Sequence, residues 1–495
     1  MKKSWLWFLI SFPFLVNAQS HFQIHQLRVA GEILSVRPAD FEQDGSRELC
    51  VFYIRKKNQQ SQKFLTIFWA EDQNRYLNKN SFTLRLPKDY IFYDTGMLPG
   101  ETERVLVFLT LNQAVFYRWK NHQLEGANPL VSFSRQLVQI PSSTQIISYD
   151  FFYDWNQDGK DEILVPGMNQ ALLFYFQQGR WSSHPIYLPA QVRFFSFSLP
   201  GLMEHPEISV NYELPALYLE DWDSDGSKEL FAIKNKKIWI YKKEAQGIFS
   251  SQPCARITYP LQLTSSQRRR SQINIQVKEI DRDNKADLIV SHQQGGIFNQ
   301  KAELKIYLGK DRWSRARDFP SPSRSWTFNA WIVGPFFRDF DSDQDLDLVI
   351  PTIYSGFITT AKIFLTGSIP LEWQYYFLEN GTYPPQANFI DKIDLRIDFT
   401  EGRMTSGVPN VFADFNGDGI DDIIYSKSEK ELVVQIRDKK ARRTNQMEII
   451  QVPASTIPLT KDLNRDGLDD IYLYDIQGDP AHQGVINVLI NLGGW

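Results

Sequence analysis

Cysteine and histidine are scarce in this 495-residue chain, which has only two cysteines and seven histidines. An exported domain held together by disulfides needs many cysteines, so a disulfide framework is excluded. The histidines are scattered and form no recognised metal-binding motif, and no nucleophile elbow built on serine or cysteine occurs. The sequence therefore predicts no catalytic residue, and it leaves the question of an enzyme activity open.

Long hydrophobic runs are absent beyond the N-terminus. Residues 1–18 contain two lysines, an apolar run from Trp5 to Val16 and a plausible cleavage site before Gln19, which is typical of a signal peptide. No later segment approaches the roughly 20 apolar residues of a membrane-spanning helix. We therefore expect an exported mature chain, residues 19–495, that has no transmembrane segment and is secreted, periplasmic or located at the cell surface.

One acidic motif, in contrast, is abundant. A pattern of the type D-x-[DNE]-x-D-G-x-x-[DE], followed by apolar residues, is exemplified by "DWNQDGKDEILV" from Asp154. So much negative charge beside an apolar run needs compensation, and a bound divalent cation provides it. Six copies occur, the fourth with Gln344 in place of glycine, and they start at Asp40, Asp154, Asp221, Asp339, Asp414 and Asp462.

Two weaker units fill the gaps between these copies. One starts at Thr95 and is expected to bind no ion, and the other is a shortened loop at Asp281. The eight starts lie 48 to 75 residues apart, near a period of about 60, which indicates a repeat fold. Short apolar runs separated by turn residues follow each loop, as in "KIWIYKK", and predict antiparallel strands.

Repeats of this length, with about four strands that are apolar on both faces, must be covered on both sides. Stacking the sheets around a ring does this, so we predict an all-β fold, a β-propeller of four-stranded blades in a single domain over residues 19–495. Eight blades are favoured, with residues 22–29 pairing with 484–492 to close the ring. Seven is the alternative if the unit at Thr95 is not a blade.

The two cysteines are expected to be unpaired. On a ring of eight, Cys50 and Cys254 lie too far apart for a disulfide, and Cys50 is expected to be buried.

The helical calcium hand is a competing interpretation of the loop, because it also spaces acidic residues in this way. Its twelfth position is a glutamate, whereas Val165 stands at that position in the loop from Asp154 and every other copy is also without a carboxylate there. Strand-forming residues flank the loop instead of helices. The helical hand is therefore excluded.

The loops and the "DLVI"-like runs that follow them resemble the FG-GAP or VCBS repeats, found in the integrin α-subunit head and in many secreted bacterial proteins. The resemblance implies a hairpin turn that holds Ca²⁺ through side chains one, three, five and nine of each loop and the carbonyl of residue seven, with about four to six ions in all. The side chains that it implies as ligands are Asp40, Glu42, Asp44, Glu48, Asp154, Asn156, Asp158, Glu162, Asp221, Asp223, Asp225, Glu229, Asp339, Asp341, Asp343, Asp347, Asp414, Asn416, Asp418, Asp422, Asp462, Asn464, Asp466 and Asp470.

The calcium is expected to be structural, because position two of the loops is aromatic or Leu and should pack between blades. The function that this pattern favours is an exported calcium-binding scaffold for binding or adhesion, whose partner is a protein or an anionic glycan at the cell envelope or extracellular surface. No nucleic-acid partner is expected, and the oligomeric state is undetermined. The alternatives are a polysaccharide lyase with a propeller fold and a purely structural part of an envelope assembly.

Two surface features are candidates for the partner site. Basic clusters at 268–270 and 437–443 are expected to face solvent. The long unit after Asp339 contains "QYYFLENGTYPPQANF", which predicts a surface loop. Tyr375, Tyr376 and Tyr383 are its candidates for contact with the partner, and the alternative is that each packs onto its own blade.

Overall fold

The fold is described from a computed structural model, which covers residues 20–495 except 59, 135–136, 138–140, 198–206, 245–246, 262–270, 297, 310–318, 355, 400–402, 441, 455–456 and 476–481. The predicted signal peptide, residues 1–18, lies outside the described residues. Within the described part, no helix is long and apolar enough to cross a membrane.

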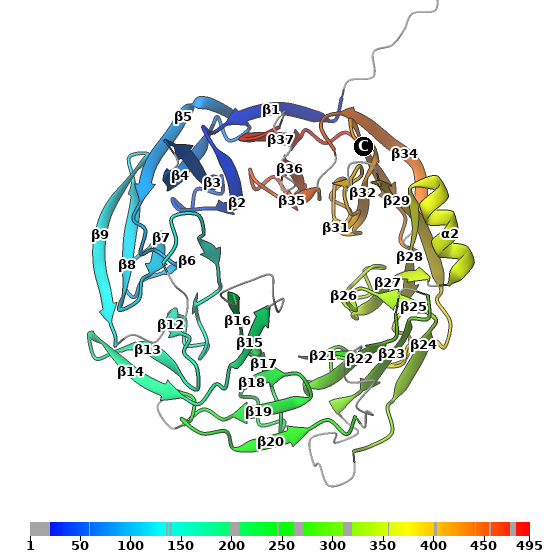
Figure 1. Cartoon of the computed structure of the whole chain (residues 1–495), viewed down its shortest axis with the longest axis horizontal. Coiled ribbons are helices and arrows are strands. Elements are labelled where there is room, and N and C mark those ends of the chain that lie inside the picture. The colour runs from blue at the N-terminus through cyan, green and yellow to red at the C-terminus, as the bar shows by residue number, and fades with distance from the viewer. Residues whose placement is uncertain are drawn as a thin grey trace, which may run out of the picture.

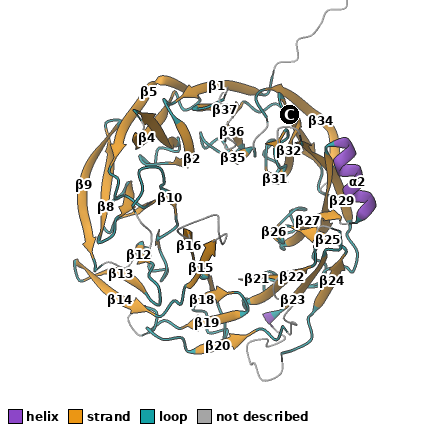
Figure 2. Ribbon diagram, in the orientation of Figure 1, coloured by secondary structure: helices purple, strands orange, loops and turns teal. Residues whose placement is uncertain are grey.

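The described residues form eight antiparallel blades of four strands, arranged in a ring (Figure 1). The prediction of an all-β propeller with eight blades is confirmed, and the alternative of seven is wrong because the unit at Thr95 forms a complete blade. Figure 2 shows how completely strands dominate the ring.

Each blade is given from the innermost strand outward. Blades one and two are β2 (Glu32–Ala39), β3 (Glu48–Lys57), β4 (Gln60–Glu71) and β5 (Arg75–Leu86), then β6 (Phe92–Met97), β7 (Arg104–Leu109), β8 (Gln113–Lys120) and β9 (Gln123–Ser132). Blades three and four are β11 (Phe152–Tyr153), β12 (Glu162–Val165), β13 (Ala171–Gln177) and β14 (Arg180–Ile186), then β17 (Ala216–Glu220), β18 (Glu229–Lys234), β19 (Lys237–Tyr241) and β20 (Ala255–Thr258).

The second half of the ring repeats this order. Blades five and six are β21 (Ser271–Lys278), β22 (Asp287–Gln294), β23 (Lys301–Tyr307) and β24 (Arg324–Phe328), then β25 (Ala330–Ile332) with β26 (Phe336–Arg338), β27 (Asp347–Tyr354), β28 (Ser368–Tyr376) and β29 (Phe389–Asp398). Blades seven and eight are β31 (Asn410–Ala413), β32 (Asp422–Ser428), β33 (Glu431–Arg437) and β34 (Arg443–Gln451), then β35 (Leu459–Lys461), β36 (Asp470–Tyr474), β37 (Val485–Asn491) and β1 (Phe22–Arg28).

Short strands extend three regions of the ring. β10 (Ile147–Ser148) runs parallel to β6, and β30 (Arg403–Met404) pairs with β29. The hairpin of β15 (Gln191–Phe197) and β16 (Glu207–Glu213) comes between blades three and four, and in the projection of Figure 1 it lies inside the ring.

The ring is closed by strands from the two ends of the chain. β1 pairs with β37 in continuous antiparallel register, from Phe22 opposite Asn491 to Arg28 opposite Val485, as predicted. The side chain of Leu27 is fully buried in the core between blades eight and one. Blade eight therefore takes its outer strand from the N-terminus, and this strand connects the two ends of the chain without a covalent bond between them.

The tyrosines proposed to contact a partner are core residues, so the prediction of partner contact is wrong and the alternative, packing onto their own blade, is confirmed. Tyr375 and Tyr376 lie in β28 with exposed fractions of 0% and 2%, and Tyr383, also 2% exposed, donates a hydrogen bond of 2.6 Å to the Leu346 carbonyl. The helix α2 (Phe357–Thr366) between β27 and β28 accounts for part of the extra length of this blade.

Both cysteines are free, and Cys50 is buried while Cys254 is exposed, which confirms the prediction. Burial raises the pKa of the Cys50 thiol far above its ordinary value. We expect a thiol-specific reagent to modify one cysteine in the native protein and two in denaturant, because only the thiolate reacts and Cys50 is closed to solvent. Two rapidly reacting thiols under native conditions would contradict this, and a Cys254→Ser variant should show none.

Candidate metal-binding loops

The six acidic loops join the first and second strands of blades one, three, four, six, seven and eight. Because the blades share one strand order and every strand pair concerned is antiparallel, these loops all lie on one face of the ring. Position six of each loop is in the left-handed region, at φ 86° for Gly159 and 80° for Gly419, which is why glycine occurs there. Gln344 adopts φ 75° at this position, a conformation that costs a non-glycine residue about 1 kcal/mol.

The aspartate at position one folds the loop around its own carboxylate. In the loop from Asp154, Oδ1 accepts the N–H of Asp158 at 3.0 Å and Oδ2 accepts that of Gly159 at 2.9 Å. The loops at Asp221, Asp339, Asp414 and Asp462 repeat the bond from the position-six N–H, at 2.9, 2.9, 2.9 and 3.1 Å. The turn is thus defined by its own side chains.

The carboxylate at position nine fastens the loop to the blade. Asp470 is fully buried, and its Oδ2 accepts the N–H of Leu463 at position two at 2.8 Å. Its Oδ1 accepts the N–H of Asn491, at the end of the third strand, at 2.7 Å. Asp347 and Asp422 make the same two kinds of bond, to Phe340 and Leu378 and to Phe415 and Arg437.

Carboxylate oxygens converge in three of the six predicted loops. One ligand atom from each of three side chains lies within 4.8 Å of the others in the sets Asp154, Asp158 and Glu162; Asp221, Asp223 and Asp225; and Asp339, Asp341 and Asp347. The shortened loop brings Glu279, Asp281 and Asp287 together in the same way, and the sequence pattern did not mark Glu279. Hard oxygen donors in such clusters fit Ca²⁺.

In the two loops closest to the repeat motif, as far as they are described, three carboxylates do not converge. Their asparagines are oriented like Asn156 in the loop from Asp154, whose Nδ2 donates to Glu162 Oε1 at 3.0 Å. Asn416 Nδ2 donates to Asp418 Oδ2 at 3.0 Å, and Asn464 Nδ2 donates to Asp466 Oδ2 at 2.8 Å. In both, the asparagine oxygen accepts the backbone N–H of position five. To bind an ion, the Asn side chain in each would have to present its oxygen in place of its nitrogen.

The loop at Asp40 is the least regular of the six. Asp44 Oδ1 accepts the Ser46 N–H at 2.8 Å, and Glu48 accepts the Phe41 N–H at 3.0 Å. Glu42, however, lies 4.0 Å from His122 Nδ1, away from a compact ligand cluster. Among the described residues of this loop, three carboxylates do not converge as they do at Asp154.

Burial raises the pKa of the position-nine carboxyl groups, and the other loop carboxylates raise it further. The pKa rises to about 8 for Glu48, Glu162 and Asp470, and to about 7 for Asp347 and Asp422, although backbone N–H donors oppose the shift. Glu229 behaves similarly, with a pKa of about 7. Without a cation, each loop thus holds a carboxylate that is costly to ionise.

This predicts an unusual pH dependence for the metal-free protein. A carboxyl group whose pKa is raised in the folded state contributes its stability fully below the unfolded-state pKa and loses it as pH rises through the folded-state value. With chelator present, we expect the loops to contribute less stability at about pH 8 than at about pH 5.5. The measurement is the melting temperature against pH for wild type and for Asp470→Asn, whose neutral amide should flatten the decline. An identical slope in both proteins would contradict the prediction.

Position two packs the loop against the core, as predicted. Phe41, Phe340, Phe415 and Leu463 are fully buried, and Trp222 is partly buried against the core between blades four and five. Trp155 packs in the same manner beside blade four. In each loop, therefore, an apolar residue that packs on the core stands directly after the position-one aspartate.

Sequence reasoning missed a second role of the loops, which is to join neighbouring blades. Asp161, at position eight, accepts the N–H of Met97 in the preceding blade at 2.6 Å. Asp421 accepts from Arg338 Nε at 2.7 Å, and Asp469 accepts from the Asp414 N–H at 3.0 Å. The paired acids at positions eight and nine in three of the motifs were the available signal.

Part of one predicted basic cluster, 437–443, is engaged in ion pairs within the ring. Arg437 is buried, with Nη2 3.3 Å from Asp391 Oδ2, and Arg443 Nη2 lies 2.7 Å from Asp391 Oδ1. The other three basic residues of this segment, Lys439, Lys440 and Arg442, are exposed. Two of the five basic residues are therefore taken up by contacts between blades six and seven, and the other predicted cluster, 268–270, lies outside the described residues.

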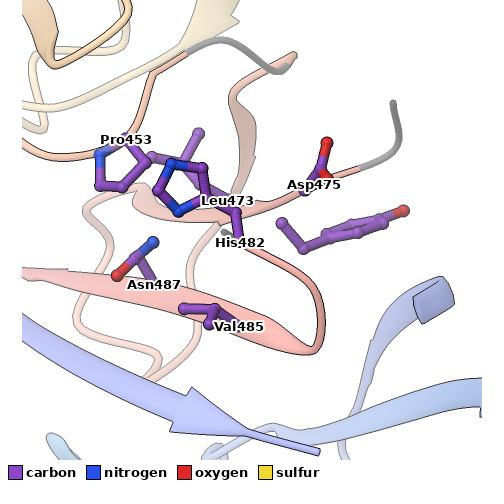
Figure 3. A pocket seen from close by; sticks show the side chains of 7 residues that line it. Pro453, Leu473, Asp475, His482, Val485 and Asn487 are labelled. Atoms are coloured by element: carbon purple, nitrogen blue, oxygen red, sulfur yellow. The ribbon is translucent and has the colours of Figure 1, made fainter. Parts of the chain in front are cut away.

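The described part of the ring includes a small pocket and an open depression. The pocket, in blade eight, has a volume of about 10 Å³ and is lined by Pro453, Leu473, Tyr474, Asp475, His482, Val485 and Asn487, six of which are labelled in Figure 3. The depression, between blades five and six, has a volume of about 480 Å³ and is lined by Leu308, Pro320, Ser321, Ser323, Asn380, Gly381 and Thr382. Neither lining, as far as the residues are described, brings together lysines or arginines of the kind a lyase needs.

No protein-family model matches the chain, and no curated protein sequence matches it. Solved structures with a similar fold include an Agrocybe aegerita lectin that recognises non-reducing terminal N-acetylglucosamine, with a TM-score of 0.35, 11% identity and coverage of 94% of this chain and 87% of the lectin. The β-propeller domain of Vanderwaltozyma polyspora Nup133 has a TM-score of 0.39, 8% identity and coverage of 88% and 99%. The WD40 domain of Toxoplasma gondii coronin has a TM-score of 0.31, 10% identity and coverage of 76% and 77%.

Proposed function

We propose that the chain is an exported β-propeller of the FG-GAP or VCBS type, stabilised by calcium, that acts as a scaffold for binding or adhesion at the cell envelope or extracellular surface. The observation that carries the proposal is the convergence of three carboxylates in each of several loops, of which those at Asp154 and Asp339 also contact a neighbouring blade. Calcium bound there would neutralise the repulsion among these side chains and leave the rest of the ring available for a partner.

The loops at Asp154, Asp221 and Asp339 are the first candidates to hold ions, since their ligand atoms already lie together. The loops at Asp40, Asp414 and Asp462 complete the proposed set of four to six. Calcium supplies no reactive group in this proposal. The carboxylates hold the ion. The carboxylate at position nine, the first residue of the buried second strand, links the ion to the backbone of the blade through its hydrogen bonds, as Asp470 does.

Direct calcium binding tests the proposal. Isothermal titration of calcium into chelator-treated protein is expected to show four to six sites, and terbium should give sensitised luminescence because Trp155 and Trp222 adjoin position one of two loops. Asp158→Asn and Asp225→Asn should each remove one site, while Asp72→Asn in a hairpin turn outside the loops should remove none. A protein that binds neither ion at millimolar concentration would overturn the calcium part of the proposal.

Export requires a separate measurement. In the native host, the processed chain is expected outside the cytoplasm with Gln19 at its N-terminus. N-terminal sequencing of each cell fraction determines this, and an unprocessed chain confined to the cytoplasm would contradict the assignment.

A further inference from the structure

The helix α2 carries apolar residues on the side that faces solvent. The exposed fractions of Phe357, Phe364 and Leu365 are 78%, 66% and 86%, and their spacing of i, i+7 and i+8 places them on one face of the helix. Thr360, a polar residue, is buried. This is the reverse of the usual arrangement, in which the apolar face of a surface helix packs on the core.

The apolar surface continues beyond the helix at both ends. Phe298, 59% exposed, belongs to blade five, and its ring centroid lies 6.5 Å from that of Phe357. Phe399, 44% exposed, follows β29 and stacks on Phe364 with the centroids 5.0 Å apart. We call Phe298, Phe357, Phe364, Leu365 and Phe399 the α2 strip, and a contiguous surface of this kind marks an interaction site.

The α2 strip stands out from the ring. Figure 1 shows α2 on its outer edge. The connection that contains α2 joins the second and third strands of blade six, and Phe298 lies in the corresponding connection of blade five. Both connections belong to the face opposite the acidic loops, so the strip is separate from the proposed calcium sites.

The shape and charge of the strip indicate what covers it. Three large side chains that are two-thirds or more exposed project outward, so a rigid protein partner would need a matching groove, whereas the interface of a bilayer adapts to them. Residues 348–371 contain one charged side chain, Lys362, and no acidic one. A lysine beside inserted apolar residues can keep its amine at the level of lipid phosphates.

We propose that the α2 strip is a membrane-binding surface, whose phenylalanines and Leu365 insert at the boundary between lipid headgroups and acyl chains while Lys362 contacts phosphate. Amphipathic helices that lie in the bilayer interface bury their apolar faces about 5–10 Å deep. Bound in this way, the ring attaches to a lipid surface by one edge, and the face with the acidic loops stays accessible.

Co-sedimentation of the full mature chain with phosphatidylcholine vesicles, with and without a minor fraction of phosphatidylglycerol, tests the proposal. Wild type should bind both kinds of vesicle in calcium buffer, and the binding should persist in about 0.5 M salt because apolar insertion is not screened. Phe364→Gln/Leu365→Gln should weaken binding by about tenfold or more, since two inserted side chains are lost without a change in charge or much change in helix propensity.

The matched control is Met447→Gln/Ile457→Gln, which alters two exposed apolar residues outside the α2 strip and should bind like wild type. Melting curves show whether each variant is folded. A folded wild type that fails to bind vesicles overturns the proposal. So does a homodimer in light scattering that the Phe364→Gln/Leu365→Gln variant abolishes while vesicle binding is unchanged, because the strip is then an interface between copies.

A labelled cysteine identifies the inserted segment independently of affinity. In a Cys254→Ser background, an environment-sensitive dye on Leu365→Cys should shift to the blue when vesicles are added, and the same dye on Met447→Cys should not. Cys50 is buried and does not compete for the label. A blue shift at position 447 alone would place the contact elsewhere and overturn the assignment of the α2 strip.

Discussion

Removing calcium with a chelator is expected to lower the melting temperature of the protein by on the order of 10 °C. A ligand that binds only the folded state contributes about 1.4 kcal/mol per site at a tenfold excess over its Kd, so six sites together contribute about 8 kcal/mol. With an unfolding entropy of about 2.1 cal/mol/K per residue, this corresponds to several degrees, and more at higher calcium. The drop should be cooperative, because the same loops join neighbouring blades.

Single-site variants determine whether the effect belongs to the loops. Asp418→Ala and Asp466→Ala should each lower the melting temperature in calcium by a fraction of the chelator effect and change it little in chelator. Glu125→Ala removes an exposed acid from β9 and should leave both curves unchanged. If wild type melts at the same temperature in calcium and in chelator, the acidic loops hold no stabilising ion.

The fold could be predicted because each repeat carries its structure locally. The position-nine acid and the apolar run after it predict a buried second strand, and β12 and β18 begin at Glu162 and Glu229 as that pattern requires. The N-terminal strand is predicted to complete blade eight because the last unit of the sequence is one strand short, and residues 22–29 precede the first unit. The register of β1 with β37 confirms that argument.

The details that failed depend on contacts between distant residues. Tyr375 is buried against Phe340, with ring centroids 5.1 Å apart, and neither its type nor its position in a long unit reveals this. Arg437 pairs with Asp391 of the preceding blade, so one arginine of a basic sequence run lies in a buried ion pair. The order of carboxylates in a motif also does not specify their geometry, because Asn416 can present oxygen or nitrogen to the same point.

Truncating the chain before Val29, which removes β1, is expected to be more damaging than any single loop change. Blade eight would lose the strand that covers β37, and Phe22 and Leu27 would leave the core at about 1.5–3 kcal/mol each. The row of unpaired N–H and C=O groups on β37 would then be open to pairing with other chains. Most of the truncated protein should be insoluble or oligomeric, as measured by size-exclusion chromatography with light scattering.

A circular permutant distinguishes two contributions of β1: its pairing with β37, and the continuous backbone that it provides between blades eight and one. His21 stacks on Trp495 with ring centroids 4.1 Å apart, and the Leu492 N–H bonds to the His21 carbonyl at 2.7 Å, so a short linker can join residue 495 to residue 20. In a chain that starts at Gly31 and ends with β1 as a hairpin after β37, all strands are present, but blades eight and one no longer share a continuous backbone. We expect this permutant to fold as a monomer and to unfold faster than wild type, because noncovalent contacts alone then hold blades eight and one together. These contacts are the packing around Leu27 and hydrogen bonds such as that from Arg47 Nε to the Asp462 carbonyl at 2.8 Å. An unfolding rate equal to that of wild type would mean that the shared strand contributes pairing and burial alone, and that the ring needs no closure through the backbone.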